Sequence, residues 1–144
     1  MHTAGKSMQN IQLMFSSKTP EWETPQDLFD KLNAEFNFGV DVCATQENAK
    51  CKLFYSSGSL EKDWPVNMVK WMNPPYGKVI GLWVKKASEN PLTVCLLPAR
   101  TDTRWFHQFI YNKPNVEIRF LKGRLKFGAA VNSAPFPSMI IVFR

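Results

Sequence analysis

Apolar residues recur at helical spacing in two segments of the chain. The first set is Leu28, Leu32 and Phe36, and the second is Ile80, Trp83, Val84 and Ala87. Because residues three and four positions apart share one face of a helix, each set predicts an amphipathic helix with one buried side. We expect the first helix to end near Asn37 and the second to end at Pro91.

Polar residues and prolines mark where helices should begin. Thr24 is a good capping residue, Pro25 suits the first helical position, and Asp27 adds a negative charge to the first turn. Residues 101–103 can cap a third helix. The inner face of that helix would hold Trp105, Phe106, Phe109 and Ile110.

Short apolar runs between and after these helices predict strands. They cover residues 38–44, 53–55, 69–72, 92–97, 116–121, 125–127 and 139–143. Strands that alternate with helices favour an α/β fold with crossover connections between parallel strands. We therefore predict a Rossmann-like sheet that is mostly parallel, with an antiparallel edge formed by the closing strands and helices on both faces.

Length and composition suit one domain. The chain has 144 residues and is 44% hydrophobic, which is enough to bury a core. We expect residues 1–18 to form a flexible lead-in and residues 19–144 to form the domain. No apolar run approaches the roughly 18 residues of a membrane span. Three cysteines without C-x-x-C spacing, and two distant histidines, favour reduced cytosolic thiols over a disulfide framework or a metal site.

The positive charge of the chain is concentrated at its C-terminal end. Residues 1–103 contain 11 basic and 11 acidic residues, whereas residues 104–144 contain 7 basic residues and one acid, Glu117. The formal net charge of +6 therefore comes from the last part of the chain. A basic region of this kind is typical of a polyanion contact and favours a nucleic-acid partner.

The segment Asn73-Pro74-Pro75-Tyr76 carries the most chemistry. It follows an apolar strand, and its two prolines fix the backbone and remove two N–H donors. Such a turn presents a side-chain amide oxygen and main-chain carbonyls as rigid acceptors beside an aromatic ring. A planar –NH2 group on an aromatic or amide carrier fits that arrangement, because the acceptors take its two hydrogens.

Several segments carry a resemblance to a known family. They are residues 22–25 (WETP), 41–44 (DVCA), 48–51 (NAKC), 71–77 (WMNPPYG), 96–103 (LLPARTDT), 122–127 (KGRLKF) and 134–136 (APF). In this order they resemble the small phage-type DNA N6-adenine methyltransferases, which are Dam-like, single-domain enzymes with an Asn-Pro-Pro-Tyr motif. The match covers about residues 19–143. It implies a minimal S-adenosylmethionine (SAM)-dependent methyltransferase fold, a cytoplasmic protein, and a host-cell location if a phage or prophage encodes it.

The resemblance assigns the reaction to the proline-rich turn. It implies that Asn73 Oδ1 and the Pro74 carbonyl accept from the adenine amino group, that Pro75 stiffens the turn, and that Tyr76 stacks on the flipped base. The methyl group would pass directly from SAM to the N6 nitrogen, without a covalent enzyme intermediate. Fixed acceptors would stabilise the positive charge that develops on that nitrogen.

The resemblance also implies a SAM site. Residues implied to contact SAM are Thr24, Pro25, Asp41, Cys43, Ala44, Asp63 and Asn73, with Asp63 beside the adenine ring of the donor. One feature departs from most SAM enzymes, which carry a glycine-rich turn after the first strand. Here residues 43–46 read Cys-Ala-Thr-Gln and contain no glycine.

Double-stranded DNA is the implied partner, with no membrane and no metal involved. Residues expected to contact phosphates are Arg100, Arg119, Lys122, Arg124 and Lys126, several of them on one face of a strand pair that turns at Gly123. Two alternatives remain open. One is an N-methyltransferase that acts on RNA or on protein glutamine, and the other is a non-catalytic nucleic-acid-binding protein on the same scaffold.

Overall fold

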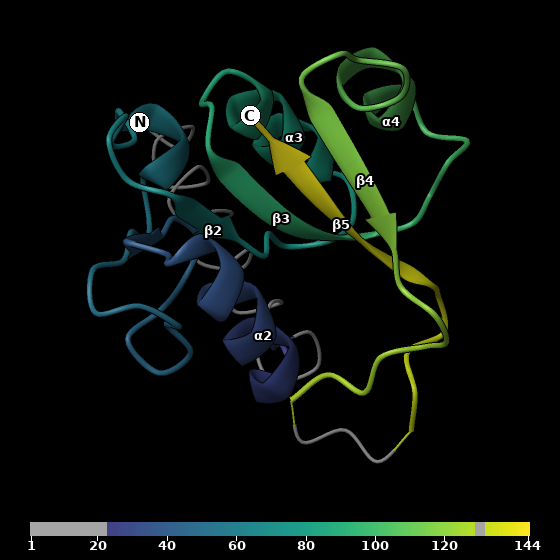
Figure 1. Cartoon of the computed structure of the whole chain (residues 1–144), viewed down its shortest axis with the longest axis horizontal. Coiled ribbons are helices and arrows are strands. Elements are labelled where there is room, and N and C mark those ends of the chain that lie inside the picture. Colours follow the sequence, from purple (N-terminus) through teal and green to yellow (C-terminus); the bar gives the residue numbers. More distant parts are fainter. Residues whose placement is uncertain (1–22, 129–131) are drawn as a thin grey trace, which may run out of the picture.

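A five-stranded sheet forms the centre of the molecule (Figure 1). The computed structural model describes residues 23–128 and 132–144. In spatial order the strands are β1 (Val40–Asp41), β2 (Lys70–Met72), β3 (Thr93–Pro98), β5 (Ser138–Phe143) and β4 (Val116–Phe120). The first three strands are parallel, and β5 is antiparallel to both β3 and β4. The fold is therefore mixed α/β, as the sequence predicts.

The closing strands form the antiparallel end of the sheet, as expected, although the one strand of reversed direction, β5, does not lie at the edge. β5 is inserted between β3 and β4, so β4 is the edge strand. Every residue of β5 is buried, whereas the residues of β4 are half-buried or exposed. The more apolar strand takes the interior position, where both of its faces are covered.

Helices cover both faces of the sheet. On one face α3 (Ile80–Ser88) and α4 (Arg104–Phe109) pack together, and on the other lies α2 (Gln26–Phe36) (Figure 1). All four residues that define the predicted stripe of α3 are buried. In α2 the buried residues are Phe29 and Leu32, while Leu28 and Phe36 pack at the margin of the core. The periodicity therefore predicts α3 more closely than α2.

The two predicted helix caps have different outcomes. Thr103 caps α4, because its hydroxyl accepts a hydrogen bond from the Phe106 N–H at 3.3 Å. The prediction that Thr24 caps α2 is wrong, since Pro25 occupies the N-cap position and makes no side-chain cap. The hydroxyl of Thr24 is instead bonded to Asn73, a residue 49 positions away.

Three predicted strands are shorter or absent. The run at residues 38–44 forms only the two residues of β1, because the Asp41 carboxylate accepts from the Cys43 N–H and turns the chain. Residues 53–55 form an isolated bridge from Phe54 to Asp41. Residues 125–127 form no strand; a left-handed Gly123 turns the chain before them and Phe127 is buried in the core.

The predicted flexible lead-in, residues 1–18, lies outside the described residues. In the part of the chain that the structure describes, no helix has both the length and the apolar character that crossing a bilayer requires.

Candidate active site

The proline-rich turn leaves the sheet directly at the carboxyl end of β2. Asn73, Pro74 and Pro75 are buried, Tyr76 is half-buried, and both X–Pro bonds are trans. Gly77 follows with φ of 114°, in a region that side chains rarely adopt, and its carbonyl accepts from the Ile80 N–H at the start of α3. The turn is therefore held at both ends, by β2 and by α3.

Two hydrogen bonds fix the amide of Asn73. Its Nδ2 donates to Thr24 Oγ1 at 2.9 Å, and its Oδ1 lies 3.2 Å from the Tyr76 hydroxyl. The side chain is 1% exposed. Because Thr24 takes a hydrogen from the nitrogen, the orientation of the amide is set and the oxygen faces Tyr76. A carbonyl oxygen has two lone pairs, so it can accept a second hydrogen bond.

The hydroxyl and the ring of Tyr76 both make contacts that hold the turn in place. Its hydroxyl also lies 3.2 Å from the Leu96 carbonyl of β3, which ties the turn to the neighbouring strand. Its ring meets the edges of Phe127 and Phe136, with centroids 6.4 and 5.6 Å away. Burial raises the pKa of the Tyr76 phenol above its usual value. The hydroxyl therefore remains a proton donor at neutral pH.

Asp41 organises the loop that follows β1. Its Oδ1 accepts from the Cys43 N–H and its Oδ2 from the Lys50 N–H, each at 3.1 Å. The carboxylate is 1% exposed. A carboxylate with two backbone donors holds the loop over residues 43–50, in which no residue has a positive φ angle.

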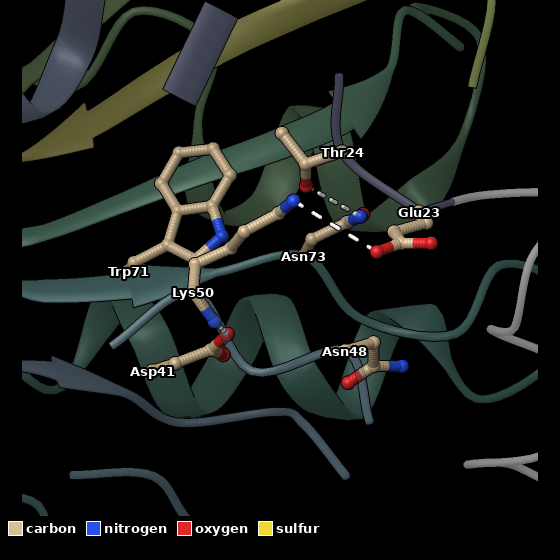
Figure 2. Close-up of a pocket in the computed structure, with 7 residues that line it drawn as sticks. All are labelled: Glu23, Thr24, Asp41, Asn48, Lys50, Trp71 and Asn73. Atoms are coloured by element: carbon tan, nitrogen blue, oxygen red, sulfur yellow. Dashed lines mark hydrogen bonds and ion pairs between the residues drawn. The ribbon is translucent and has the colours of Figure 1, made fainter. Parts of the chain in front are cut away.

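These residues meet at a narrow cleft (Figure 2). Its lining consists of Glu23, Thr24, Asp41, Asn48, Lys50, Trp71 and Asn73. The lining side chains lie so close together that they leave essentially no space for a water molecule. Three side chains that the sequence singled out are brought together here: Thr24, Asp41 and Asn73. They come from the start of α2, the end of β1 and the end of β2, so the cleft lies at the carboxyl ends of parallel strands.

Four other residues implied to contact SAM do not line this cleft. Cys43 and Ala44 are fully buried, and Cys43 belongs to the core on the α3 side. Pro25 is at the N-cap of α2. Asp63 is exposed, and its neighbour Trp64 is buried against Trp83 at a centroid distance of 6.5 Å.

The sequence reasoning assigned no role to four residues of the cleft: Glu23, Asn48, Lys50 and Trp71. Asn48 Oδ1 accepts from the Thr45 N–H at 2.7 Å, while its Nδ2 is buried with no hydrogen-bond partner. A buried amide N–H beside a cleft can donate to an acceptor on a ligand. Each of the four residues lies in a segment that carries the family resemblance. Membership in those segments is the sequence feature that could have identified them.

The basic residues fall into two groups. Arg119 is paired with Glu35 through two bonds of 2.7 and 2.6 Å and with Glu117 at 2.6 Å. Its charge is thus neutralised inside the chain, contrary to an open phosphate contact. Exposed side chains form the second group: Arg100, Lys122, Arg124 and Lys126. The last three lie on a loop and not on the expected strand pair.

This loop, residues 121–128, ends beside the cleft. The Gly128 N–H donates to the Glu23 carbonyl at 2.8 Å, and Phe127 is buried against Tyr76. Figure 1 shows the loop running from β4 to the first turn of α2. Arg100 follows β3, and its guanidinium lies 5.9 Å from the Phe136 ring centroid. The loop with three of the exposed cations, and Arg100, are thus linked to the turn through Phe127 and Phe136, whose rings contact Tyr76.

Neither a metal cluster nor a reactive thiol is present among the described residues. No group of three or more His, Cys, Asp or Glu side chains gathers there. None of the three cysteines forms a disulfide, and burial, together with the charge of Asp41, raises the pKa of Cys51 to about 12. Burial also raises the pKa of Cys95. These thiols are poor nucleophiles at neutral pH.

Comparison with known proteins assigns the family. A curated relative, a DNA N-6-adenine-methyltransferase of Escherichia phage T1, is 33% identical over 102 residues, which is 66% of this chain and 42% of the relative. The chain thus spans less than half of that relative's length. No solved structure gives a significant match. The family model described as DNA N-6-adenine-methyltransferase (Dam) matches residues 14–144, nearly the whole chain, and the protein therefore belongs to this family.

Proposed function

We propose that this protein transfers a methyl group from SAM to the N6 amino group of adenine in DNA, and that residues 19–144 form one Rossmann-like methyltransferase domain. The observation that carries the proposal is the fixed amide of Asn73, which lines a cleft together with Asp41 and Thr24. Family membership supports the same activity.

The chemistry of the cleft fits a methyl donor with a charged amino-acid end. Asp41 offers a carboxylate whose position is fixed by two N–H groups, and Asn48 offers an amide donor without a partner. Thr24 and Asn73 lie on the opposite wall. When bound, SAM supplies an activated methyl group on a sulfonium centre. Asp41, Asn48 and Thr24 would hold it against Asn73.

Ligand entry requires the cleft to widen. Its lining leaves essentially no space for a water molecule, whereas typical small-molecule sites enclose roughly 300–1,000 Å³. The target base must also gain access to Asn73, which is 1% exposed. We therefore expect the side chains at the mouth of the cleft to move apart when the substrates bind.

The turn would act on the amino group by charge stabilisation. Asn73 Oδ1 and the Pro74 carbonyl would accept its hydrogens, which draws the nitrogen lone pair out of conjugation with the ring. Because Thr24 and Tyr76 hold the amide, no reorganisation is needed as positive charge develops on the nitrogen. Adenine must first leave the duplex, at a cost of a few kcal/mol. Stacking on an aromatic ring recovers about 1–3 kcal/mol, and Tyr76 is the aromatic residue of the turn.

DNA would bind across the exposed cations. Lys122, Arg124 and Lys126 lie on the loop that ends at the cleft, and Arg100 approaches from β3. Arg119 is left out of the proposed surface because carboxylates already neutralise it. Phosphate contacts set the register on DNA and make affinity salt-dependent.

A methyl-transfer assay tests the proposal. The protein is incubated with labelled SAM and, in separate reactions, with unmethylated duplex DNA, RNA, or a glutamine-containing protein. We expect label in the DNA alone and N6-methyladenine on nucleoside analysis. Label in RNA or protein but not in DNA would assign a different substrate. If no substrate is labelled, the protein would be a non-catalytic nucleic-acid-binding protein.

A further inference from the structure

The ammonium group of Lys50 lies inside the cleft and is poorly neutralised. The side chain is 10% exposed and lines the same space as Asn73 and Asp41. Figure 2 shows it reaching from beside Asp41 toward Thr24 and Glu23 on the opposite wall. A cation in this position is close to any ligand that occupies the cleft.

The partners of this ammonium are weak for a group so little exposed. Lys50 Nζ donates to the neutral Gln26 Oε1 at 2.8 Å, and its one ion pair within the described chain, to Glu23, is long at 3.9 Å. Direct hydrogen-bonded ion pairs are closer to about 2.7–2.9 Å. An ammonium has three donors, and a buried charge is stable only when it is paired and hydrogen-bonded. The ammonium can therefore donate to a further anionic acceptor.

The loop presents the cation together with an acid. The backbone N–H of Lys50 donates to Asp41 Oδ2, so the two residues are held in a fixed relation. SAM ends in an α-amino acid, which carries an ammonium and a carboxylate on one carbon. The charged residues of the cleft comprise two carboxylates, Asp41 and Glu23, and the one ammonium of Lys50. Each charge at that end of the donor finds an opposite charge in the lining.

We propose that Lys50 is a specificity residue that binds the α-carboxylate of the methyl donor, while the acids of the cleft face its ammonium. The proposal rests on the proposed function. The contact between Lys50 and Glu23 then marks the closed state of the cleft. The carboxylate of the donor replaces Glu23 and Gln26 as the acceptor for Lys50, which also opens the space that the ligand needs.

Calorimetric titration with two ligands tests this assignment. SAM and its decarboxylated analogue differ only by the carboxylate, so their affinity ratio measures its recognition. We expect the wild-type protein to bind SAM about tenfold to a hundredfold more tightly than the analogue, the range for a hydrogen bond to a charged group. In Lys50→Met both ligands should bind with similar affinity, whereas Lys50→Arg should keep most of the preference.

Lys52→Met is the matched control, because it removes an exposed cation from the same loop. It should leave the affinity ratio unchanged. If Lys50→Met does not fold, Lys50→Gln serves in its place, and the wild-type ratio alone still tests the proposal. Equal affinity of the wild-type protein for both ligands, or a preference that survives in Lys50→Met, overturns the assignment while leaving the proposed function intact. If the wild-type protein binds neither ligand, the proposed function itself is wrong.

Discussion

β3, β5 and β4 pair over long antiparallel ladders, whereas β1 and β2 pair over only a few residues. The β3–β5 ladder has six residue pairs and the β1–β2 ladder has two. β5 is an almost entirely apolar strand and is buried along its whole length. In contrast, β1 ends at the buried Asp41, and the buried Asn73 directly follows β2. One half of the sheet therefore supplies packing, and the other positions the polar groups of the site.

This difference has a physical cause. Buried polar groups cost free energy unless they are hydrogen-bonded, so the short strands end where side chains can reach loop N–H groups and each other. The buried polar side chains of the long ladders, Thr93 and Ser138, lie at the ladder ends, and the apolar residues between them supply hydrophobic stabilisation. Substitutions in the two halves should therefore separate stability from activity.

Asn73→Ala should give the largest effect, on activity. Loss of one preorganised acceptor is expected to lower the rate of methyl transfer about 100-fold to 1,000-fold, by analogy with other preorganised polar groups. DNA binding should change little, whereas the free energy of unfolding should fall by about 1–3 kcal/mol because Thr24 and Tyr76 lose a buried hydrogen-bond partner. Single-turnover kinetics with labelled SAM measure the rate. Asn115→Ala, at an exposed position, is the control, and an unchanged rate in Asn73→Ala would remove the turn from the mechanism.

Ile141→Ala should show the opposite pattern. Ile141 is fully buried at the centre of β5, and its truncation is expected to lower the free energy of unfolding by about 2–5 kcal/mol. Well below the unfolding transition the affinity for SAM should remain near that of the wild type. Urea denaturation and calorimetry measure the two quantities. A large loss of SAM affinity in the folded variant would contradict the division between the two halves.

The comparison can be sharpened with the basic residues. The double variant Lys122→Ala/Arg124→Ala should weaken DNA binding and lower the slope of log affinity against log salt by about 2, if each side chain makes one phosphate contact. Arg119→Ala should leave the slope unchanged, because Arg119 is paired with Glu35 and Glu117. Fluorescence anisotropy over a range of salt concentrations gives both slopes. Equal slopes in the wild type and the double variant would exclude the loop from the interface.

The smallest expected effect concerns acid stability. Hydrogen bonds from Arg119 lower the pKa of Glu35 and, together with Arg144, that of Glu117. A carboxyl group with a lowered folded-state pKa stabilises the protein above its ordinary pKa, near 4.5. That stabilisation is lost as the pH falls through the lowered value.

As the pH falls from about 5 to about 3, the free energy of unfolding should therefore decrease slightly less in Arg119→Ala than in the wild type. The difference should fade at high salt because these groups are exposed. Urea midpoints across the pH range measure it, with Arg104→Ala as an exposed control. A steeper dependence in Arg119→Ala would contradict the assignment.

The sequence predicted the features that depend on local order. The apolar stripe of α3, the runs of β3 and β5, and the strand that leads into the Asn73 turn all follow from spacing along the chain. The meeting of Asp41 and Asn73 was also within reach, because both follow parallel strands whose carboxyl ends share one edge.

Features that depend on distant pairing were not predictable in this way. The hydroxyl of Thr24 bonds to Asn73 across 49 positions, and Arg119 pairs with Glu35 across 84. A local pattern takes account only of residues that are near in sequence. It therefore assigns Thr24 to a helix cap and Arg119 to an open basic face. Lys50 likewise gains its place only when the loop folds back over the start of α2.

The double hydrogen bond to Asp41 limits what mutagenesis can reveal. Removing this acid deletes a candidate ligand contact and, in the same step, releases the two amides that give residues 43–50 their shape. Any loss of affinity in such a variant would therefore have two inseparable origins. This ambiguity is avoided by substituting side chains that bond to no backbone group. Comparing a pair of ligands in such a variant then measures the contact itself.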